Sequence, residues 1–549
     1  MEAEYGDVSR VLEGTTILVT GAAGFVGTAL LYRLLLDPKL SSRVKRVLAL
    51  IRGSTFEEAV EKLPPALREL ARPIGTDEAD AKLLILRGDC RHAQLGLTGP
   101  SLQTARQADV VIHAAGETRF MLGLSDAMDC ITDLAYQAAR FSLGSSSAKT
   151  HIHLSTTYVG WFMRNGSTMT EDFLQNDLDD DSNDTHANTY LHAKTLAEES
   201  VNALFKPQAG RPLHGKSVRI LRISTLGAAA AFPSPGCGAC QTSTPVSAAL
   251  AAVPVSETTP DRAWIPRDSF LDVLPVDVAV NQILALTASA HKSHTLSPAA
   301  PFHPRNGRNP VNARGTNVPV YHVASGLPPQ KQLRFLTLNK PEVKIAQPYV
   351  KEKSLMCCYM PFIEKQVHFD VSRARSAMGT TTPPSQADDD LVAPTLLFPD
   401  SVEDLGSDRA SAASPSTSPS LDGSVVFDDD AMMANARRRN SNAALSDLAS
   451  SISEDAPSDF VEEKEGRPNL SAAAAATAST ATAFNVSRTW ADQTIDCGAL
   501  EVDCGKVLEA HFGPMTASAD SAAWLGYLSV VRDEMDRYMA LAAEDSWVD

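Results

Sequence analysis

The sequence lacks any run of 18 or more apolar residues, so no transmembrane helix is expected. Residues 1–5 are acidic and have no apolar core, so we predict no secretion signal. Basic residues are outnumbered, because 49 Lys and Arg stand against 66 Asp and Glu and give a net charge of −17. This charge argues against general nucleic-acid binding and against an anionic membrane surface. Residues 546–549 carry no peroxisomal or retention signal.

Cysteine is also sparse, with eight residues scattered over 549. A chain of this length does not need disulfides, so a reducing, intracellular environment is the simpler interpretation. Cys237 and Cys240 form a C-x-x-C pair, but no second pair stands at zinc-ligand spacing, so free thiols are favoured over a metal or redox site. We expect no metal and a cytoplasmic protein, with a peripheral position on an organelle membrane as the alternative.

Short apolar runs alternate with helical patterns between residues 15 and 225. Helices are expected at residues 29–36 and 191–205, among others. The runs predicted to be strands are 16–20, 44–51, 82–87, 109–114, 151–155 and 218–223. This alternation predicts an α/β fold with a parallel, doubly wound sheet covered on both faces.

The composition changes along the chain and predicts four parts. Residues 376–484 are rich in Ser, Ala, Thr, Pro and Asp with few aromatics, so they cannot bury enough apolar surface and we predict disorder. Within them, residues 437–441 resemble a basophilic kinase site. They indicate either that Ser441 is phosphorylated or that a short basic run has arisen by chance. The tail regains Trp and Tyr and is expected to dock on the main domain or on a protein partner. The predicted parts are a main domain at 1–225, a smaller substrate lobe at 226–375, the linker at 376–484 and a helical segment at 485–549.

The most informative stretch is Gly21-Ala22-Ala23-Gly24-Phe25-Val26-Gly27, which follows an apolar strand and opens into a helix. The first glycine lets the backbone turn, the second lets it approach phosphates, and the third lets the helix pack on the strand. The spacing is G-x-x-G-x-x-G, and strand–helix loops without ligands also contain such turns. Its early position after a strand predicts a Rossmann domain that binds a dinucleotide.

Residues after the later strands refine this prediction. Arg52 follows the second strand, where an acidic residue would bind the ribose of NAD, so the arginine favours the 2′-phosphate of NADPH over a solvated surface role. Asp89 ends the third strand, where a carboxylate can bond the adenine amine. Ala114, Ala115 and Gly116 end the fourth, where small side chains let the backbone pass close to the cofactor.

Tyr190 and Lys194 stand four residues apart, which places them on one face of a helix. The cation favours phenolate, so Tyr190 becomes a better proton donor or acceptor, and Lys194 can bond the nicotinamide ribose. Thr156 follows a strand in Ser155-Thr156-Thr157, and its hydroxyl can hold a substrate carbonyl or instead satisfy the turn backbone. A surface Tyr–Lys pair is common, but its place after the fifth strand favours catalysis.

These motifs resemble the extended short-chain dehydrogenase/reductase superfamily, and within it the thioester-reductase branch that includes fatty acyl-CoA reductases (the male-sterility, NAD-binding domain). The similar segments are ILVTGAAGFVG at 17–27, VIHAAGETRF at 111–120, HLSTTYVG at 153–160, LDVLPVDVAVNQIL at 271–284 and VYHVASG at 320–326. The resemblance covers about residues 15–330. It implies a catalytic trio of Thr156, Tyr190 and Lys194. It implies a cofactor site made of Gly21, Ala23, Gly24, Phe25, Val26, Gly27, Arg52, Asp89, Ala114, Ala115, Gly116 and Lys194.

The sequence departs from the branch's pattern at several places. Ile131 stands near the position of an asparagine that usually joins the proton relay, and the usual Arg-Pro-Ser is Arg222-Ile223-Ser224. A long acidic segment separates Thr157 from Tyr190. These departures concern the substrate and the rate rather than cofactor binding.

The resemblance therefore implies an NADPH-dependent oxidoreductase that reduces an acyl thioester, with fatty acyl-CoA expected, to an aldehyde or alcohol. Residues 228–255 are apolar enough to line an acyl channel, or form a poorly ordered loop. One alternative is an extended short-chain reductase or epimerase that acts on a sugar nucleotide, sterol or flavonoid-like ketone. Another is a nonenzymatic NADP-sensing Rossmann protein, although such proteins typically lose the Tyr–Lys pair.

Overall fold

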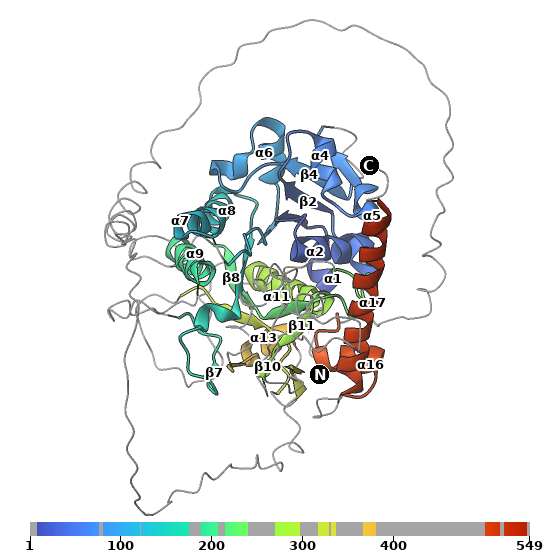
Figure 1. Ribbon diagram of the computed structural model, residues 1–549. Coiled ribbons are helices and arrows are strands. Elements are labelled where there is room, and N and C mark those ends of the chain that lie inside the picture. The colour runs from blue at the N-terminus through green and yellow to red at the C-terminus, as the bar shows by residue number, and fades with distance from the viewer. Residues whose placement is uncertain are drawn as a thin grey trace, which may run out of the picture. The chain divides into compact units, whose positions relative to one another are not determined.

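The computed structural model of the protein contains one large parallel sheet flanked by helices (Figure 1). All of the residues it describes belong to one compact unit. The described residues are 8–75, 81–120, 122–174, 188–206, 215–239, 269–296, 317–328, 331–335, 366–379, 500–515 and 521–545.

The main sheet has eight strands in the order β12-β8-β6-β5-β1-β2-β4-β3. Every pairing within it is parallel, which confirms the predicted doubly wound fold. Its strands are β1 (Thr16–Thr20), β2 (Arg46–Ile51), β3 (Ala71–Pro73), β4 (Leu83–Arg87), β5 (Val110–His113), β6 (Thr150–Thr156), β8 (Ser217–Ile223) and β12 (Val320–Val323).

Both faces of the sheet are buried. Ile17 and Val19 of β1 lie in the cluster that helices α2 (Phe25–Leu36) and α11 (Val276–Leu296) cover, whereas Leu18 lies in the opposite cluster under α8 (Asp133–Gly144). Helix α9 (Thr189–Phe205) packs beside α8 on that second face. A strand buried on two sides needs apolar residues at consecutive positions, which is why β1 reads as an unbroken apolar run.

Shorter helices and turns precede, connect or follow these strands. They are α1 (Val8–Val11), α3 (Pro38–Arg43), α4 (Phe56–Glu61), α5 (Pro65–Arg68), α6 (Gly99–Ala105), α7 (Leu124–Ala127) and α13 (Ser372–Met378), with 3₁₀ turns η1 (Ala93–Gly96) and η3 (Thr157–Gly160) and a π-helical turn η2 (Met128–Thr132).

Three two-stranded sheets lie outside the main sheet. They pair β7 (Thr168–Met169) with β14 (His368–Phe369), β9 (Thr225–Gly227) with β11 (Val273–Pro275), and β10 (Ser269–Leu271) with β13 (Leu333–Phe335). The sheet strand β12 and the covering helix α11 also come from residues after 225. The main sheet therefore draws on both of the first two predicted parts of the chain, and the division between those parts stays a prediction.

The tail packs on the main domain. Helix α16 (Cys504–Phe512) and helix α17 (Ala522–Asp545) pack together (Figure 1). Tyr527 of α17 is fully buried. The Tyr527 hydroxyl donates to the Ala228 carbonyl at 2.8 Å, and Trp524 Nε1 donates to the Lys331 carbonyl at 2.9 Å. Residues 380–484 of the predicted linker, which include Ser441, lie outside the described residues.

Candidate active site

The glycine turn joins β1 to α2, and its backbone packs too closely to leave room for a side chain at the first glycine. Gly21 has φ of +66°, and a Cβ there would lie 2.6 Å from the Ala115 amide nitrogen, so only glycine fits. Gly24 is the N-cap of α2 and provides no side-chain cap. The first amides of an uncapped helix have no intrahelical partner and attract anions. The turn therefore fits a pyrophosphate held by the backbone from Gly24 to Gly27.

The backbone after β5 connects this turn to the Tyr–Lys helix. The Ala115 amide donates to the Thr20 hydroxyl at 3.3 Å, which fixes the segment against β1. On its other side, a Cβ at Gly116 would lie 3.4 Å from Lys194 Nζ. The small residues at 114–116 thus occupy the narrow space between the glycine turn and Lys194.

Arg52 and Asp89 lie at the ends of neighbouring strands β2 and β4. Asp89 pairs with Arg91 at 2.6 Å, and the hydrogen bond from Arg91 lowers the pKa of the Asp89 carboxyl, with a smaller contribution from the Arg52 charge. The Arg52 side chain is exposed. Arg52 therefore places a cation next to the part of the predicted site that is expected to hold adenine. A cation at this position suits an anionic group on the ribose.

Lys194 is buried within α9, although lysine is seldom fully buried. Its Nζ lies 5.9 Å from the centre of the Tyr190 ring and donates to the Leu154 carbonyl of β6 at 3.4 Å. Burial lowers the pKa of Lys194 to about 8, while Glu198 one turn later acts in the opposite direction. A buried ammonium of lowered pKa at the carboxyl end of a parallel sheet is typical of a functional site.

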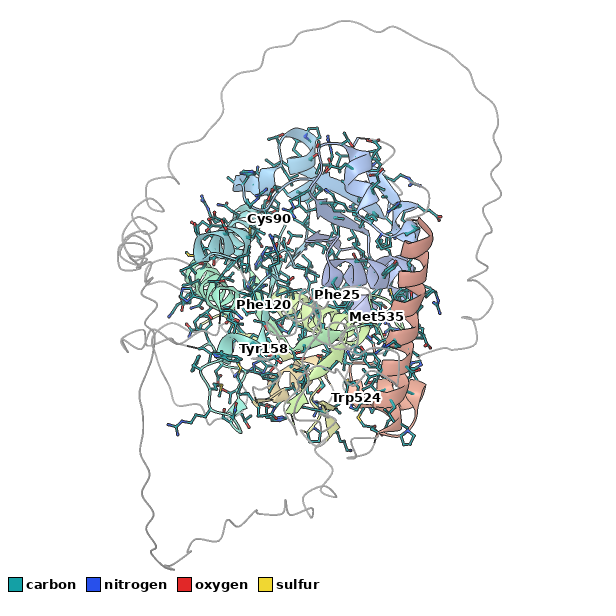
Figure 2. All side chains as sticks on the ribbon, in the orientation of Figure 1. Phe25, Cys90, Phe120, Tyr158, Trp524 and Met535 are labelled. Carbon is teal, nitrogen blue, oxygen red and sulfur yellow. The ribbon has the colours of Figure 1, made fainter. Side chains whose placement is uncertain are left out.

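Tyr190 and Thr156 complete the predicted trio. Tyr190 is half-buried, and Phe120 packs edge-on against it with ring centres 5.2 Å apart. Thr156 ends β6, and its hydroxyl caps the turn η3 by accepting from the Tyr158 amide at 3.3 Å. This cap is the structural role that the sequence left open for Thr156, and it leaves the hydroxyl proton free to donate. Phe120 and Tyr158 are marked in Figure 2.

The predicted domain matches a known family. Residues 19–283 match the model of an NAD-binding domain described as male sterility protein. The chain is similar to this family over just under half of its length. The match runs from within β1 to within α11 and so includes the glycine turn, Thr156, Tyr190 and Lys194. It confirms the resemblance seen in the sequence and makes this a nicotinamide-nucleotide-binding domain.

Individual relatives are more distant. Fatty acyl-CoA reductase 1 of Mus musculus is 28% identical over 300 residues, which are 51% of this chain and 55% of the mouse protein. Probable fatty acyl-CoA reductase 5 of Arabidopsis thaliana is 28% identical over 162 residues, covering 27% of this chain and 32% of that protein. The chain thus spans about half the length of the first of these relatives.

Among solved structures, the terminal R domain from the myxalamid PKS-NRPS biosynthetic pathway aligns with a TM-score of 0.44 and 18% identity, covering 68% of this chain and 87% of that chain. A likeness of this size does not bear on activity. No helix within the described ranges combines the length and the apolarity needed to cross a membrane.

Ile131 lies in the π-helical turn η2. Ile131 is 2% exposed and packs in the apolar cluster that contains Ala193 of α9. The next residue, Thr132, donates from its hydroxyl to the Ala193 carbonyl at 2.9 Å. The turn therefore fixes the part of α9 next to Lys194. The Ile131 side chain contributes apolar packing there and no polar group.

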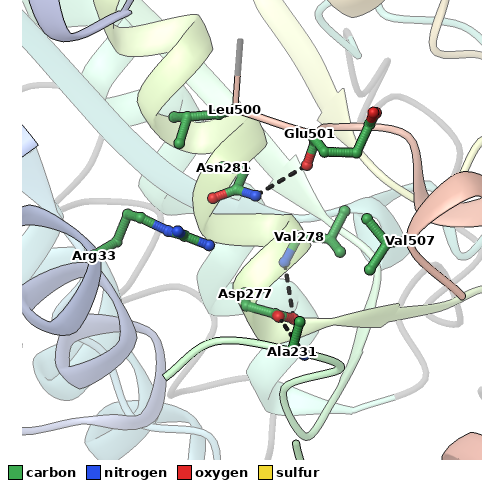
Figure 3. Close-up of a pocket in the computed structure, with 8 residues that line it drawn as sticks. All are labelled: Arg33, Ala231, Asp277, Val278, Asn281, Leu500, Glu501 and Val507. Carbon is green, nitrogen blue, oxygen red and sulfur yellow. Dashed lines mark hydrogen bonds between the residues drawn. The ribbon is translucent and has the colours of Figure 1, made fainter. Parts of the chain in front are cut away.

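Asp277 lies in the segment 271–284 and anchors residues 230–232, which belong to the predicted substrate lobe. Its carboxylate accepts hydrogen bonds from the amides of Ala230, Ala231 and Phe232 at 3.0, 2.8 and 2.9 Å. Four residues along α11, Asn281 Nδ2 donates to the Glu501 carbonyl of the tail at 2.9 Å (Figure 3). Of the predicted channel at 228–255, residues 228–239 are thus fixed by hydrogen bonds, and 240–255 lie outside the described residues.

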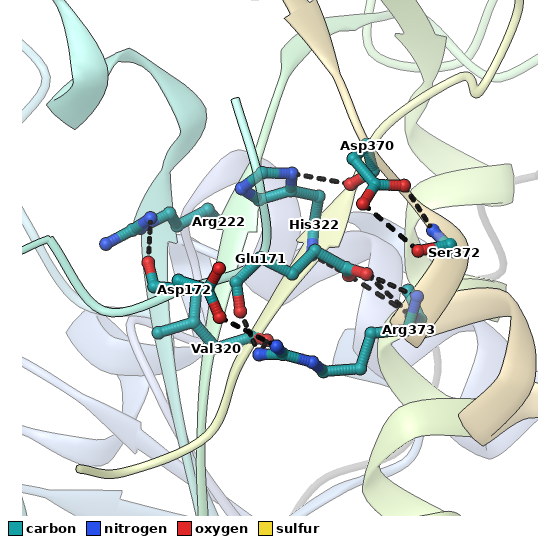
Figure 4. Close-up of polar contacts among 9 residues, drawn as sticks. Glu171, Asp172, Arg222, Val320, His322, Asp370, Ser372 and Arg373 are labelled. Atoms are coloured by element: carbon teal, nitrogen blue, oxygen red, sulfur yellow. Dashed lines mark hydrogen bonds and ion pairs between the residues drawn. The ribbon is translucent and has the colours of Figure 1, made fainter. Parts of the chain in front are cut away.

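Glu171 joins three distant segments at the edge of the sheet. Its carboxylate accepts from the His322 amide of β12 at 2.8 Å and from the Ala374 amide at the start of α13 at 3.1 Å (Figure 4). Arg373 of the same helix pairs with Asp172 at 2.8 Å. Burial raises the pKa of Glu171 to about 7, although these hydrogen bonds act in the opposite direction.

Sequence reasoning missed a row of buried polar side chains beneath the site. Arg222 of β8 pairs with Glu198 of α9, and His113 and His153 lie on the neighbouring strands β5 and β6. The signal was available, because each is a polar residue inside a strand or helix face that is otherwise apolar. Glu198 also follows Lys194 by four residues, the spacing that places both on one helix face.

Proposed function

We propose that this protein reduces an acyl thioester with NADPH, that fatty acyl-CoA is the substrate class, and that the product is an aldehyde or an alcohol. One observation carries the proposal. The segment 114–116 contacts Gly21 of the cofactor turn on one side and Lys194 on the other, so the Tyr–Lys pair lies at the edge of the predicted cofactor groove. A nonenzymatic sensor would have no use for a buried lysine beside a tyrosine at this place.

The chemistry follows from the positions of the three polar groups. NADPH, when bound, supplies a hydride to the thioester carbonyl. Thr156 and Tyr190 would hydrogen-bond the oxygen as it gains negative charge, and Tyr190 would supply the proton. The Lys194 ammonium would hold the nicotinamide ribose and favour the charge change at Tyr190. Loss of the thiol from the hemithioacetal then gives the aldehyde, and a second reduction gives the alcohol if the aldehyde stays bound.

The preference for NADPH rests on Arg52. Its guanidinium is exposed at the end of β2, and Asp89 on the next strand is already paired with Arg91. Arg52 is therefore available for a 2′-phosphate. Arg52→Ala should weaken NADPH binding at least about tenfold and leave NADH binding unchanged. Arg10→Ala, an exposed arginine on α1, is the matched control and should change neither.

Three further findings support acyl-CoA as the substrate class. The named relatives are fatty acyl-CoA reductases. The described part of the segment predicted to form the channel begins with small apolar residues, and Ala228, Ala229 and Ala230 are almost fully buried. The Gly238 backbone lies against the Phe25 ring of the glycine turn, which brings this segment next to the predicted cofactor site.

The decisive experiment follows NADPH absorbance with purified protein and acyl-CoAs of several lengths. Tyr190→Phe should lower turnover by about 10²–10⁴-fold and leave NADPH affinity unchanged, because only the proton donor is lost. Tyr136→Phe, on α8, is the control and should behave like the wild type. Turnover of a ketone or sugar nucleotide but not of acyl-CoA would assign the alternative short-chain reductase activity. Full turnover by Tyr190→Phe would refute the assigned trio.

A further inference from the structure

Two histidines lie side by side beneath the predicted site. His113 of β5 and His153 of β6 are register partners, and their rings stack with centres 5.5 Å apart and planes 15° apart. Each is only 1% exposed. His151, two residues before His153 and thus on the same face of β6, stacks on Phe205 of α9. The histidine pair therefore faces α9, the helix that carries Lys194.

The Lys194 ammonium lies beside the end of β6 and beside the segment that follows β5. Its Nζ contacts the carbonyl of Leu154, the residue directly after His153. It also lies beside Gly116, three residues after His113. Burial lowers the pKa of both imidazoles, and the Lys194 charge lowers each further, so both rings are neutral.

The described residues use only part of the hydrogen-bonding capacity of His113, His153 and Lys194. His113 Nδ1 bonds the Thr20 hydroxyl at 2.8 Å, but His113 Nε2 and both nitrogens of His153 have no partner there. Within the same residues, Lys194 Nζ makes a single long hydrogen bond, although an ammonium has three donors. Buried polar groups are rarely left unsatisfied, and a buried water with two to four polar partners is the usual solution.

We propose that His113 and His153 hold an ordered water against the Lys194 ammonium and thereby position Lys194 for the nicotinamide ribose and for Tyr190. The inference rests on the proposed function, since it gives Lys194 the role assigned there. Each neutral imidazole can accept a hydrogen bond on one nitrogen, and the ammonium can donate to the same water. The two histidines are positioning residues, because they act through Lys194 and do not touch the substrate.

The groups that face Lys194 come from three elements. Glu198 and Tyr190 lie on α9, His113 on β5, and His153 on β6. His151 also influences both imidazoles, from the far end of the same row. Removing the water's partners leaves the ammonium less solvated. His153→Leu should therefore make Lys194 lose its proton at a lower pH.

The experiment measures the NADPH dissociation constant by nicotinamide fluorescence between pH 6 and 10. In the wild type, affinity should fall above about pH 8, where Lys194 loses its proton. In His153→Leu the fall should begin about one pH unit earlier. His153→Gln keeps a hydrogen-bonding group and should restore the wild-type profile, and Lys194→Met should show no step. His151→Leu, equally buried on the same strand face, is the control for a purely structural effect.

A His153→Leu profile that coincides with those of the wild type and His151→Leu would overturn the proposal. If His153→Leu does not fold, a crystal structure of the wild-type protein decides. It should show a water within hydrogen-bond distance of Lys194 Nζ and of an imidazole nitrogen, and density without that water would overturn the proposal. Because the readout is cofactor binding, a protein that binds NADPH but reduces no acyl thioester would refute the proposed function alone.

Discussion

Glu198 of α9 and Arg222 of β8 form an ion pair that is buried on both sides. Arg222 Nε donates to Glu198 Oε1 at 2.9 Å, and Arg222 Nη2 donates to Glu198 Oε2 at 2.7 Å. The two side chains are 4% and 0% exposed. Arg222 also donates to the Asp172 carbonyl at 3.1 Å, so one guanidinium ties α9 and the edge segment to the sheet (Figure 4). The helix that carries Tyr190 and Lys194 is therefore fixed one turn beyond the lysine.

We predict that Glu198→Gln lowers the free energy of unfolding by about 3–5 kcal/mol, because it leaves the buried Arg222 charge uncompensated. Urea-induced unfolding measures this change. Glu13→Gln breaks the exposed Arg43–Glu13 pair and should cost no more than about 1 kcal/mol. The double variant Glu198→Leu with Arg222→Met should recover most of the loss, since neither charge then stays buried. Equal losses in Glu198→Gln and Glu13→Gln would contradict the prediction.

The third glycine of the turn should be as sensitive as the first. A Cβ at Gly27 would lie well inside contact distance of the Gly21 carbonyl and 2.7 Å from Ala22 Cα, so Gly27→Ala forces α2 away from the turn. We expect NADPH affinity to fall by at least about tenfold, measured by fluorescence titration. Gly144→Ala, at the end of α8, is the control because no atom lies within 4 Å of its added Cβ. Wild-type affinity in Gly27→Ala would show that α2 does not bind the pyrophosphate.

A separate prediction concerns the docking of the tail helix α17 on the main domain. Tyr527→Phe removes the hydroxyl that donates to the buried Ala228 carbonyl and should lower the free energy of unfolding by about 1–3 kcal/mol. Its neighbour Leu525 is 53% exposed, so Leu525→Ala should change stability by no more than about 0.5 kcal/mol. Thermal unfolding of the full chain compares the two variants. If Tyr527→Phe is as stable as Leu525→Ala, α17 does not dock on the segment that contains Ala228.

Most strands of the main sheet were predictable because they are buried on two faces and are therefore rich in consecutive apolar residues. The predicted runs at 16–20 and 218–223 correspond to β1 and β8 within one residue. The helix after the glycine turn begins at Phe25 rather than Ala29, because the turn itself supplies the first helical residues. The edge strand β3 was missed, since three residues that include Pro73 show no periodicity.

The parts of the site that were missed depend on tertiary contacts. The π-helical turn η2 is held by the Glu117 amide, which donates to the Cys130 carbonyl at 3.3 Å, and by its own Thr132 hydroxyl, which donates to the Ala193 carbonyl of α9. Neither contact has a local sequence signal. Likewise, His113 and His153 come from segments 40 residues apart and meet only because β5 and β6 pair in this register. Motifs that lie within one strand–turn–helix unit could be read from the sequence. The polar residues of the supporting row are also visible there as exceptions in apolar segments, but which of them meet depends on the strand register.

The last prediction concerns what the buried lysine does to stability. The pKa of Lys194 is about 8 in the folded protein, against 10.5 for an ordinary lysine. Between these values the unfolded chain binds more protons than the folded one, so stability rises with pH. Relative to Lys194→Met, the wild-type free energy of unfolding should therefore rise by about 3 kcal/mol from pH 8 to pH 10.5.

Below pH 8 the cost of burying the charge is present in full, so Lys194→Met should be the more stable protein at pH 7 even though it loses its ribose contact. Urea unfolding of both proteins at several pH values isolates Lys194, because every other titrating group is common to the two. Lys45→Met, at an exposed position, should leave the pH dependence unchanged. If the difference between wild type and Lys194→Met does not vary with pH, Lys194 is solvated in the folded protein. In that case, holding the Lys194 ammonium beside Tyr190 would not lower the free energy of unfolding of the wild-type protein.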